Sequence, residues 1–461
     1  MPTECNAEQL QFSCVERRRV VATFDGGTVS SDAGALLLGR ADEAIGLIDR
    51  LAGCFSDHRK PELIEHTVRT MIGQRVFGMA LGYEDLNDHE QLRHDPVFGA
   101  LLGKLQAKRS DCAALAGKST LNRLELHARE GAVDHYHKIR PQTEAIEGLF
   151  VDMFLEAHPE PPAQLVLDLD ATDDPLHGHQ EGRFFHGYYD GYCYLPLYIF
   201  CGEHLLASKL RTADIDGAAG AGEEVERIVA QIRARWPEVK IILRADSGFC
   251  REPLMVWCEQ NAVDYVFGLA RNSRLVRSIG AELHEAALES AQTARPARRF
   301  KELSYRTRRS WSRARRVVAK AEQTGDKANP RFIVTSLSIH DWPMRELYED
   351  LYCARGEMEN RIKEAQLNLF ADRLSTETFR ANQLRLWFSS AAYVLMHALR
   401  RIGLAGTGLA RACANTIRLR LLKIAAVVTV SVRRVKLAMS QACPNQREFI
   451  AAFHALSAAA R

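Results

Sequence analysis

Three short apolar runs constrain the fold of this 461-residue chain more than any other feature. They are AQLVLDLDATDD (163–174), VKIILRADSGFC (239–250) and DYVFGLA (264–270). Each is typical of a buried strand, and the first two strands end in acidic residues. Two aromatic and aliphatic strands with a turn at Gly202 follow the first run, and helical stretches separate the later ones. This order predicts an α/β sheet with mixed strand directions.

The regions around these strands differ in composition, and we predict four parts. They are a mainly helical N-terminal domain (1–157), an α/β core (158–270 and 330–400), a basic, β-rich insertion (271–329) and a basic C-terminal segment (401–461). The further expected elements are helices from residue 33, at 60–81, 83–92, 119–129 and 379–399, and a strand at 425–437. Ser31 or Asp32 is the expected cap of the first helix.

The net charge is only +3, but the positive charge is concentrated in two blocks. Glu302 is the only acid between residues 295 and 320, and Glu448 is the only acid from residue 398 onward. Such blocks indicate surfaces that bind a polyanion, whereas an ordinary solvated face has mixed signs.

The cysteines and the apolar runs point to a cytoplasmic protein. The eleven cysteines include no CxxC pair, which argues against a zinc ribbon and favours reduced thiols. The N-terminal residues lack the layout of a signal peptide, and no apolar run approaches membrane-spanning length. We therefore expect a cytoplasmic protein without a membrane partner.

The stretch 342–373 predicts one long helix, because it has Pro343 near its start and good helix formers throughout. At 100° per residue, one arc of about 80° holds five polar or aromatic side chains. These are Tyr352, Arg355, Glu359, Lys363 and Gln366. An apolar stripe adjoins this face. Glu359 thus borders a packed face among cations, which suits a metal or phosphate site; a solvated helix with salt bridges is the alternative.

Two carboxylates at strand ends are candidate partners for Glu359. Asp170 ends the first apolar run, with Asp168 on the same side of that strand, and Asp246 ends the second. Strand ends are where sites form in α/β sheets, so Asp170, Asp246 and Glu359 are expected to meet at one edge. Three oxygen donors suit Mg²⁺ or Mn²⁺, and such a cluster can hold two ions about 4 Å apart. Each Asp taken singly is also a plausible turn former.

Four strings occur in the order DLDATDDPLHGHQ, FHGYYDGYCYLPLY, RADSGFC and YCARGEMENRIKEAQ. Together they resemble the DDE transposases of bacterial insertion sequences, and more narrowly the family numbered thirteen-eighty, related to the insertion-sequence-four group. The resemblance extends over nearly the whole chain. It implies a ribonuclease-H-like catalytic core with an insertion between the second Asp and the Glu.

The resemblance also assigns the acidic residues. In that group the first catalytic Asp lies in a D-x-T context, which matches Asp170 and not Asp168. The second precedes a small residue, a Gly and an aromatic residue, which matches Asp246. The resemblance therefore implies that Asp170, Asp246 and Glu359 are the catalytic metal ligands.

The helix carries most of a third motif of the group. In this pattern two residues separate a Tyr from an Arg, three separate the Arg from a Glu, and six separate the Glu from a Lys. Tyr352, Arg355 and Glu359 match the first three positions. The last position is Gln366, a departure from the pattern. Because Lys363 lies on the same face, we expect it to take the cationic role and to contact DNA phosphates with Tyr352 and Arg355.

The sequence hypothesis is a transposase that cleaves the terminal inverted repeats of its element and transfers the freed strand into target DNA. Double-stranded DNA is the expected partner, with a homodimer on DNA and nucleoid association when bound. The alternatives are a catalytically inactive DNA-binding relative and a metal-dependent nuclease unrelated to transposition.

The aromatic series between Phe184 and Phe200 has two interpretations. The series is more typical of strand core, and a base-stacking platform is the less favoured alternative. The nearby histidines His177, His179 and His186 are expected to orient the loop, because their spacing does not suit zinc.

Overall fold

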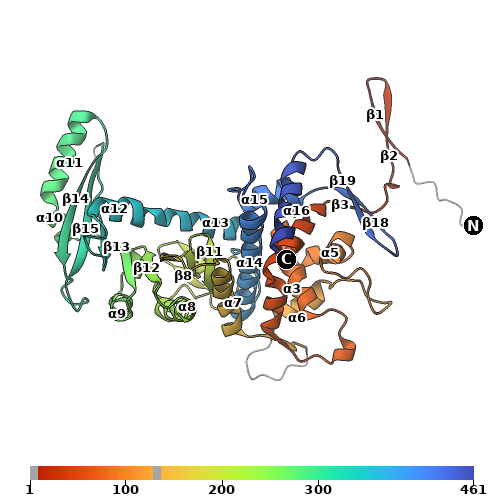
Figure 1. Ribbon diagram of the computed structural model, residues 1–461, viewed down its shortest axis with the longest axis horizontal. Coiled ribbons are helices and arrows are strands. Elements are labelled where there is room, and N and C mark those ends of the chain that lie inside the picture. Colours follow the sequence, from red (N-terminus) through yellow and green to blue (C-terminus); the bar gives the residue numbers. More distant parts are fainter. Residues whose placement is uncertain (1–8, 128–135, 326, 461) are drawn as a thin grey trace, which may run out of the picture. The chain divides into compact units, whose positions relative to one another are not determined.

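The computed structural model describes residues 9–127, 136–325 and 327–460 (Figure 1). The chain forms two compact units. The first comprises Met1–Ala52, Asp57–Leu124 and Leu395–Arg461, and the second comprises Gly53–Ser56 and Glu125–Val394. This division groups the C-terminal segment with N-terminal residues, and the four predicted domains stay predictions. The end of the helix predicted at 119–129 lies outside the described residues. Most of the N-terminal stretch that was searched for a signal peptide also lies outside them.

The second unit contains a nine-stranded mixed sheet, so the predicted mixed α/β sheet is confirmed. The strand order is β11-β10-β6-β12-β13-β17-β15-β14, with β16 paired to β15. Strands β6, β12 and β13 run parallel, and the other pairs are antiparallel. The bounds are β6 Gln164–Ala171, β10 Leu197–Cys201, β11 His204–Lys209, β12 Lys240–Ala245, β13 Asp264–Leu269, β14 Ala297–Tyr305, β15 Arg315–Thr324, β16 Lys327–Ala328 and β17 Arg331–Thr335.

Helices cover both faces of this sheet. On one face the alternate residues of β6, such as Leu165 and Leu167, pack in a large apolar cluster with helix residues such as Ile228 and Met255. The helices on this face include α7 Thr143–Glu156, α8 Ala221–Arg235 and α9 Glu252–Gln260. The other face carries a smaller cluster that includes Ile242 and packs against the long helix. The polar residues of β6 therefore face the long helix.

The long helix is continuous from residue 344 to 369 but changes its winding. It comprises α12 Met344–Glu346, a π turn over Leu347–Tyr352, a 3₁₀ turn over Cys353–Arg355 and α13 Gly356–Leu369. The single regular helix predicted for 342–373 is therefore wrong in its first half. A step of 100° per residue does not hold across π and 3₁₀ turns, and π turns often occur at functional sites.

The stretch predicted as a basic, β-rich insertion begins with two helices that the sequence analysis missed. They are α10 Ser273–Ser278 and α11 Gly280–Thr293, and α11 packs on β14 and β15 (Figure 1). Many of its basic side chains pair with glutamates, some within the same stretch and some outside it. For example, Arg315 is buried between Glu252 and Glu259, and Lys301 pairs with Glu282. Much of the basic block thus holds the unit together and does not face solvent as free charge.

The predicted aromatic strand at 183–200 is instead three strands. A hairpin of β8 Phe184–His186 and β9 Gly191–Tyr194 precedes β10, and β9 also pairs with β7 Asp174–Pro175. The core interpretation is right only for the second half, where Tyr194, Tyr198 and Phe200 are buried. The first half is largely exposed.

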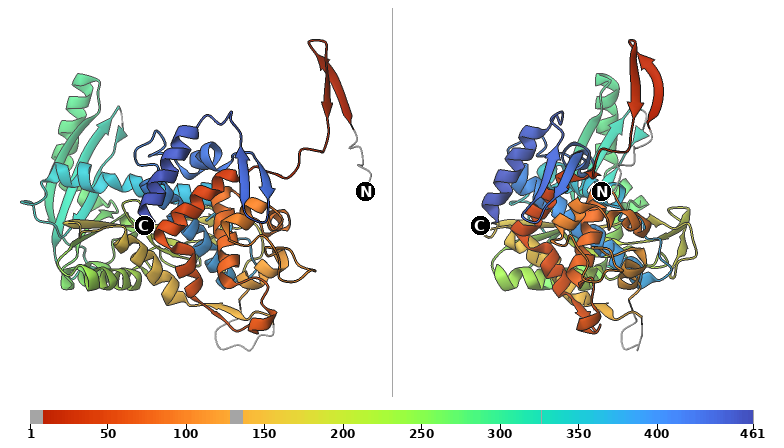
Figure 2. Two further views of the ribbon diagram at one scale, coloured as in Figure 1. Left: turned by 45° about the vertical axis from the view of Figure 1, so that its right-hand side comes forward. Right: turned by 90° about the vertical axis from the view of Figure 1, so that its right-hand side faces the viewer.

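The first unit is mainly helical (Figure 2). Its elements are β1 Leu10–Val15, β2 Arg18–Ala22, β3 Val29–Ser30, α1 Leu36–Ile45, α2 Leu47–Gly53, α3 Val68–Leu81, α4 His89–Leu92, α5 Pro96–Leu101, α6 Lys118–Glu125, α15 Ala414–Ile417, β18 Ala426–Val430, β19 Val435–Met439 and α16 Gln446–Ala459. Helix α14 Phe379–Ala398 leads into it. Helix α1 packs against α16, so the two ends of the chain share one unit.

Several local predictions for this unit need correction. The helix predicted at 83–92 is shorter, because a 3₁₀ turn over Leu86–Asp88 leads into α4. Helix α3 begins at Val68, where Thr67 caps it, and not at residue 60. The single strand predicted at 425–437 is the β18–β19 hairpin. Asp32 precedes the first helical turn, but its carboxylate accepts from Tyr83 and pairs with Lys423 and makes no capping hydrogen bond. Among the described residues, no helix has the length and apolar character needed to cross a bilayer.

Candidate active site

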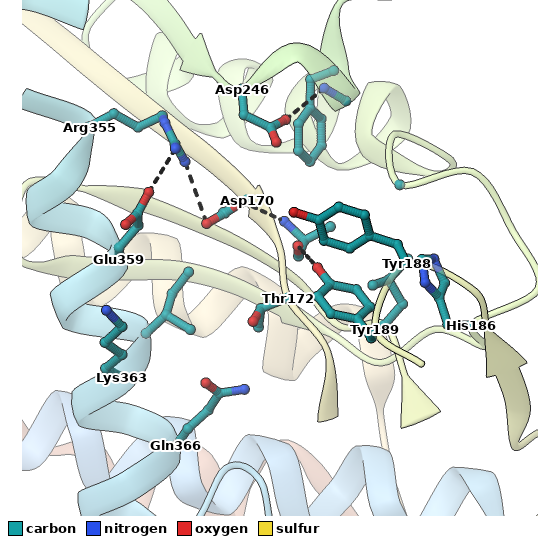
Figure 3. Close-up of a pocket in the computed structure, with 16 residues that line it drawn as sticks. Asp170, Thr172, His186, Tyr188, Tyr189, Asp246, Arg355, Glu359, Lys363 and Gln366 are labelled. Carbon is teal, nitrogen blue, oxygen red and sulfur yellow. Dashed lines mark hydrogen bonds and ion pairs between the residues drawn. The ribbon is translucent and has the colours of Figure 1, made fainter. Parts of the chain in front are cut away.

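One pocket of about 470 Å³ in the second unit brings together the three predicted carboxylates (Figure 3). Its lining includes Asp170, Asp246, Arg355, Glu359, Lys363 and Gln366. Strand β6 supplies the first Asp, the loop after β12 supplies the second, and α13 supplies Glu359. Because β6 and β12 are parallel neighbours, with Leu169 opposite Ala245, their C-terminal ends meet at the same edge of the sheet.

The charged form of Asp170 is disfavoured by its surroundings. Burial raises its pKa to about 7; the nearby Asp246 and Glu359 act in the same direction, and Arg355 opposes them. One carboxylate oxygen accepts a hydrogen bond from the Ala171 amide at 3.0 Å. A buried carboxylate beside two others favours the binding of a cation.

Asp246 serves both as a turn former and as a pocket residue. Its Oδ1 accepts a hydrogen bond from the Gly248 amide at 2.8 Å and caps the short 3₁₀ helix Ser247–Phe249. Gly268 on β13 lies directly behind it. A Cβ at residue 268 would lie 2.8 Å from the Ser247 nitrogen and 2.7 Å from the Tyr352 hydroxyl, so only glycine lets these groups approach.

Arg355 bridges two of the carboxylates. Its Nη2 lies 2.7 Å from Oε1 of Glu359 and its Nη1 lies 3.6 Å from Oδ2 of Asp170 (Figure 3). Burial disfavours the charge on Arg355, but Asp170 and Glu359 outweigh this effect and raise its pKa. A positive charge therefore already lies between two of the predicted metal ligands.

The helix presents four of its five predicted face residues to the pocket. The residues that line it are Arg355, Glu359, Lys363 and Gln366. The last three belong to α13, and Arg355 immediately precedes this helix. Tyr352 is not among the described lining residues; it packs against Tyr348 with ring centroids 5.6 Å apart. It lies at the end of the π turn, and its hydroxyl is next to Gly268, behind Asp246.

Lys363 and Gln366 differ in what they contact. Gln366 donates a hydrogen bond from Nε2 to the Asp173 carbonyl at 3.1 Å, which ties the helix to the loop after β6. Lys363 is exposed in the pocket wall. The Gln366 amide thus makes a structural contact, and Lys363 is the one of the two residues that carries a positive charge into the pocket.

A buried ion pair ties together the three elements that carry the carboxylates. Arg244 on β12 bonds Asp168 on β6 twice, at 2.5 and 2.8 Å, and donates to the Leu351 carbonyl of the long helix at 2.5 Å. Asp168 and Arg244 precede Asp170 and Asp246 by two residues each, so their side chains lie one layer below the pocket. The sequence analysis noted Asp168 but missed Arg244, since no local pattern indicates a pairing 76 residues apart.

Three aromatic residues of the pocket were not predicted as site residues. His186, Tyr188 and Tyr189 from the β8–β9 hairpin line the side opposite Glu359 and Lys363 (Figure 3). Burial raises the pKa of Tyr189 to about 12, and its hydroxyl faces the Ala171 carbonyl at 3.4 Å. The only signal in the sequence was the aromatic density next to the first Asp motif.

The three carboxylates are not gathered into a ready-made metal cluster. Within the described part of the chain, no group of three or more His, Cys, Asp and Glu side chains is arranged to hold an ion. In this structure the guanidinium of Arg355 lies between Asp170 and Glu359 instead. Whether the three residues are catalytic ligands stays a prediction at this point.

A family model described as "Transposase DDE domain group 1" matches residues 12–461. The chain belongs to this family. The transposase is accordingly an enzyme of the class that cleaves DNA and transfers strands, and divalent metal ions are the general cofactors of DDE transposases. The family-level part of the sequence hypothesis is confirmed.

The other two comparisons add little for this transposase. No curated protein matches the chain. A cryo-EM structure of the piggyBac transposase synaptic complex with hairpin DNA aligns over 85% of this chain and 80% of that chain, with 12% identity and a TM-score of 0.42. That likeness is too distant to bear on the site or its ligands.

Proposed function

We propose that the chain is the transposase of a bacterial insertion sequence of the thirteen-eighty family. It would cleave phosphodiesters at the ends of its element and join them to target DNA. The observation that carries this proposal is a pocket in which Asp170, Asp246 and Glu359 from three elements meet the cations Arg355 and Lys363. Carboxylates hold divalent ions and guanidinium or ammonium groups hold phosphates, so the pocket meets both needs of phosphodiester chemistry.

A ribonuclease-H-like core is part of the proposal. The partial order β11-β10-β6-β12-β13 supports it, because an antiparallel meander is followed by two strands parallel to β6. The proposed aspartates lie at the ends of β6 and β12, and the glutamate lies on a helix later in the chain. The stretch 271–329 lies between the second Asp and the Glu, as the family resemblance implies.

The donor set fits a divalent metal. Asp170, Asp246 and Glu359 offer hard oxygen ligands without Cys or His, which suits Mg²⁺ or Mn²⁺, and we propose two ions. Burial of an ionised Asp170 beside two carboxylates is unfavourable, and this also favours a bound cation. When bound, such ions activate the attacking oxygen and stabilise the leaving oxygen.

The reaction then consists of two displacements at phosphorus. Water attacks the phosphodiester at the element end, the P–O3′ bond breaks, and a 3′-hydroxyl and a 5′-phosphate remain. The freed 3′-hydroxyl attacks a phosphodiester of the target, so one P–O bond forms as another breaks. Arg355 and Lys363 bind the phosphates during both steps, while DNA contact by Tyr352 stays a prediction.

The remaining parts have proposed roles in holding DNA. The N-terminal helical domain (1–157) would bind the inverted repeats, and the basic C-terminal segment (401–461) would supply backbone contacts. Joining two ends requires two active sites, so a homodimer on DNA is expected. The exposed part of the insertion, rather than its paired arginines, would add to these contacts.

The experiment that tests the proposal combines nicking with strand transfer. Purified protein is incubated with a labelled duplex bearing the end of its own element, a second unlabelled plasmid and Mg²⁺. We expect nicking at the end and joined products, and loss of both when EDTA removes the metal. Nicking without joined products would favour the metal-dependent nuclease, and DNA binding without nicking would favour the inactive relative.

Lys363 and Gln366 give a sharper prediction about phosphate binding. Replacing Lys363 with Met is expected to weaken binding of the cleavable duplex and to reduce the slope of log K against log salt by about 1, because one phosphate contact is lost. Fluorescence anisotropy over a salt series measures this. Gln366→Leu is expected to keep the slope, and Lys240→Met, at the opposite end of β12, is the control. A lower slope only for Gln366→Leu would contradict the assignment.

A further inference from the structure

The β8–β9 hairpin exposes aromatic rings at the edge of the candidate active site. The exposed fractions are 85% for Tyr188, 54% for Phe185, 48% for Tyr192 and 41% for Phe184. Scattered single exposures are ordinary, but four within nine residues form a patch that water disfavours. The hairpin is well defined, with Phe185 opposite Tyr192 and a tip at Gly187–Asp190 where Asp190 has φ +52°.

The patch is continuous with the carboxylate pocket. Tyr188 and Tyr189 line that pocket together with Asp170 and Asp246, and the two rings meet edge to face with centroids 5.0 Å apart (Figure 3). Tyr189 is held by its contact with the Ala171 carbonyl, one residue beyond Asp170. The exposed ring of Tyr188 therefore lies beside the groups proposed to act on the phosphodiester.

The chemistry of the patch selects a neutral aromatic ligand. The sequence FFHGYYDGYCY from Phe184 to Tyr194 contains no Lys or Arg and one acid, so it offers little to a phosphate. Arg183, just before this stretch, is already engaged, since it stacks over Tyr192 at 4.6 Å and donates to the Gly178 carbonyl. The exposed rings of Tyr188 and Phe185 suit the face of a nucleobase, because any base can stack on an aromatic side chain.

We infer that the β8–β9 hairpin stacks an unpaired nucleobase next to the phosphodiester held at the carboxylate pocket. This inference rests on the proposed function, since it places DNA in that pocket. A base inside a duplex shows only its edges, so the ligand must be a base that has left its stack. Tyr188 forms the primary platform, with Phe185 and Tyr192 beside it, and together they position the strand. They take no part in proton transfer.

Binding to two DNA probes tests this inference. Fluorescence anisotropy compares a blunt duplex with the same duplex carrying a single-stranded thymidine tail, both without divalent metal. Wild type is expected to favour the tailed duplex, and Tyr188→Ala to lose about tenfold in affinity for it, a typical effect of removing one stacking ring. Tyr188→Trp should retain the affinity. Tyr136→Ala, at a residue 76% exposed outside the pocket lining, is the control for loss of an exposed ring.

A photocrosslink locates the base directly. With 5-iodouracil in the tail, irradiation is expected to attach the tail to Tyr188 or Phe185, identified by mass spectrometry of the digested complex. Equal wild-type affinity for the two probes, or equal loss on both in Tyr188→Ala, would overturn the stacking role. If metal-dependent nicking persists in that case, only the stacking inference fails. Failure of wild type to bind either probe would instead overturn the proposed function, and this inference with it.

Discussion

Glu359→Gln is expected to bind DNA and to cleave it about three orders of magnitude more slowly, or not at all. A thousandfold loss corresponds to about 4 kcal/mol of transition-state stabilisation, a reasonable value for losing a ligand of a catalytic metal. The amide keeps the shape of the side chain but not its charge. Nicking of a labelled element end in Mg²⁺ measures the rate, and anisotropy measures binding.

A neighbouring glutamate on the same helix provides the matched control. Glu357 is exposed and lies two residues away, outside the described pocket lining, so Glu357→Gln removes the same charge without touching the site. It is expected to nick at the wild-type rate. If Glu359→Gln also nicked normally, the assignment of the helix residue would be wrong.

Asp170→Asn separates the catalytic role of the site from folding. This change should abolish nicking as Glu359→Gln does, yet without metal the variant should unfold at the same temperature as wild type or higher. The reason is that burial of an ionised Asp170 beside Asp246 and Glu359 costs stability, which a neutral amide avoids. A large fall in melting temperature would indicate that Asp170 is mainly a structural residue.

The sequence predicted which carboxylates meet in one pocket better than it predicted the surroundings of that pocket. Asp170, Asp246 and Glu359 were found because strand ends and a helix face are local patterns, and the structure brings all three to one pocket. The wheel grouped Arg355, Glu359 and Lys363 on one face, and all three line the pocket, whereas Tyr352, at the end of the π turn, is not among the described lining residues.

Pairing across long sequence separations explains what the sequence analysis missed. The basic block around Arg315 suggested a free cationic surface, but its partners Glu252 and Glu259 lie 63 and 56 residues earlier in the chain. A count of acids within the block could not include them. The exposed hairpin at Tyr188 was missed for a related reason, because a high density of aromatic residues does not show where the chain turns back.

Arg244→Met is expected to destabilise the protein more than any change on its surface. The guanidinium is 9% exposed and the Asp168 carboxylate 4%, so removing Arg244 leaves a buried charge without its partner. Breaking a buried pair in this way costs about 3–5 kcal/mol. The change also removes the hydrogen bond that the Leu351 carbonyl of the π turn accepts from Arg244. Urea unfolding of the intact chain measures the loss.

Two further variants test whether the cost comes from the unpaired charge. Replacing both partners, Asp168→Leu with Arg244→Met, is expected to recover most of the stability, because neither charge is then buried. Arg251→Ala breaks an exposed pair with Asp216, in which both side chains are about half exposed, and should cost at most about 1 kcal/mol. A double variant as unstable as Arg244→Met would show that packing, rather than charge, accounts for the effect.

The activity of the double variant then tests how Glu359 is positioned. Arg244 joins β6, β12 and the long helix, so its hydrogen bond to Leu351 fixes the helix against the strands that carry the two aspartates. A refolded double variant lacks that bond. We expect it to bind the cleavable duplex as wild type does but to nick it more slowly, with the loss in the rate constant and not in the DNA concentration needed for half-maximal rate. Normal nicking in a stable double variant would mean that apolar packing around Leu351 alone aligns the helix with the two strands.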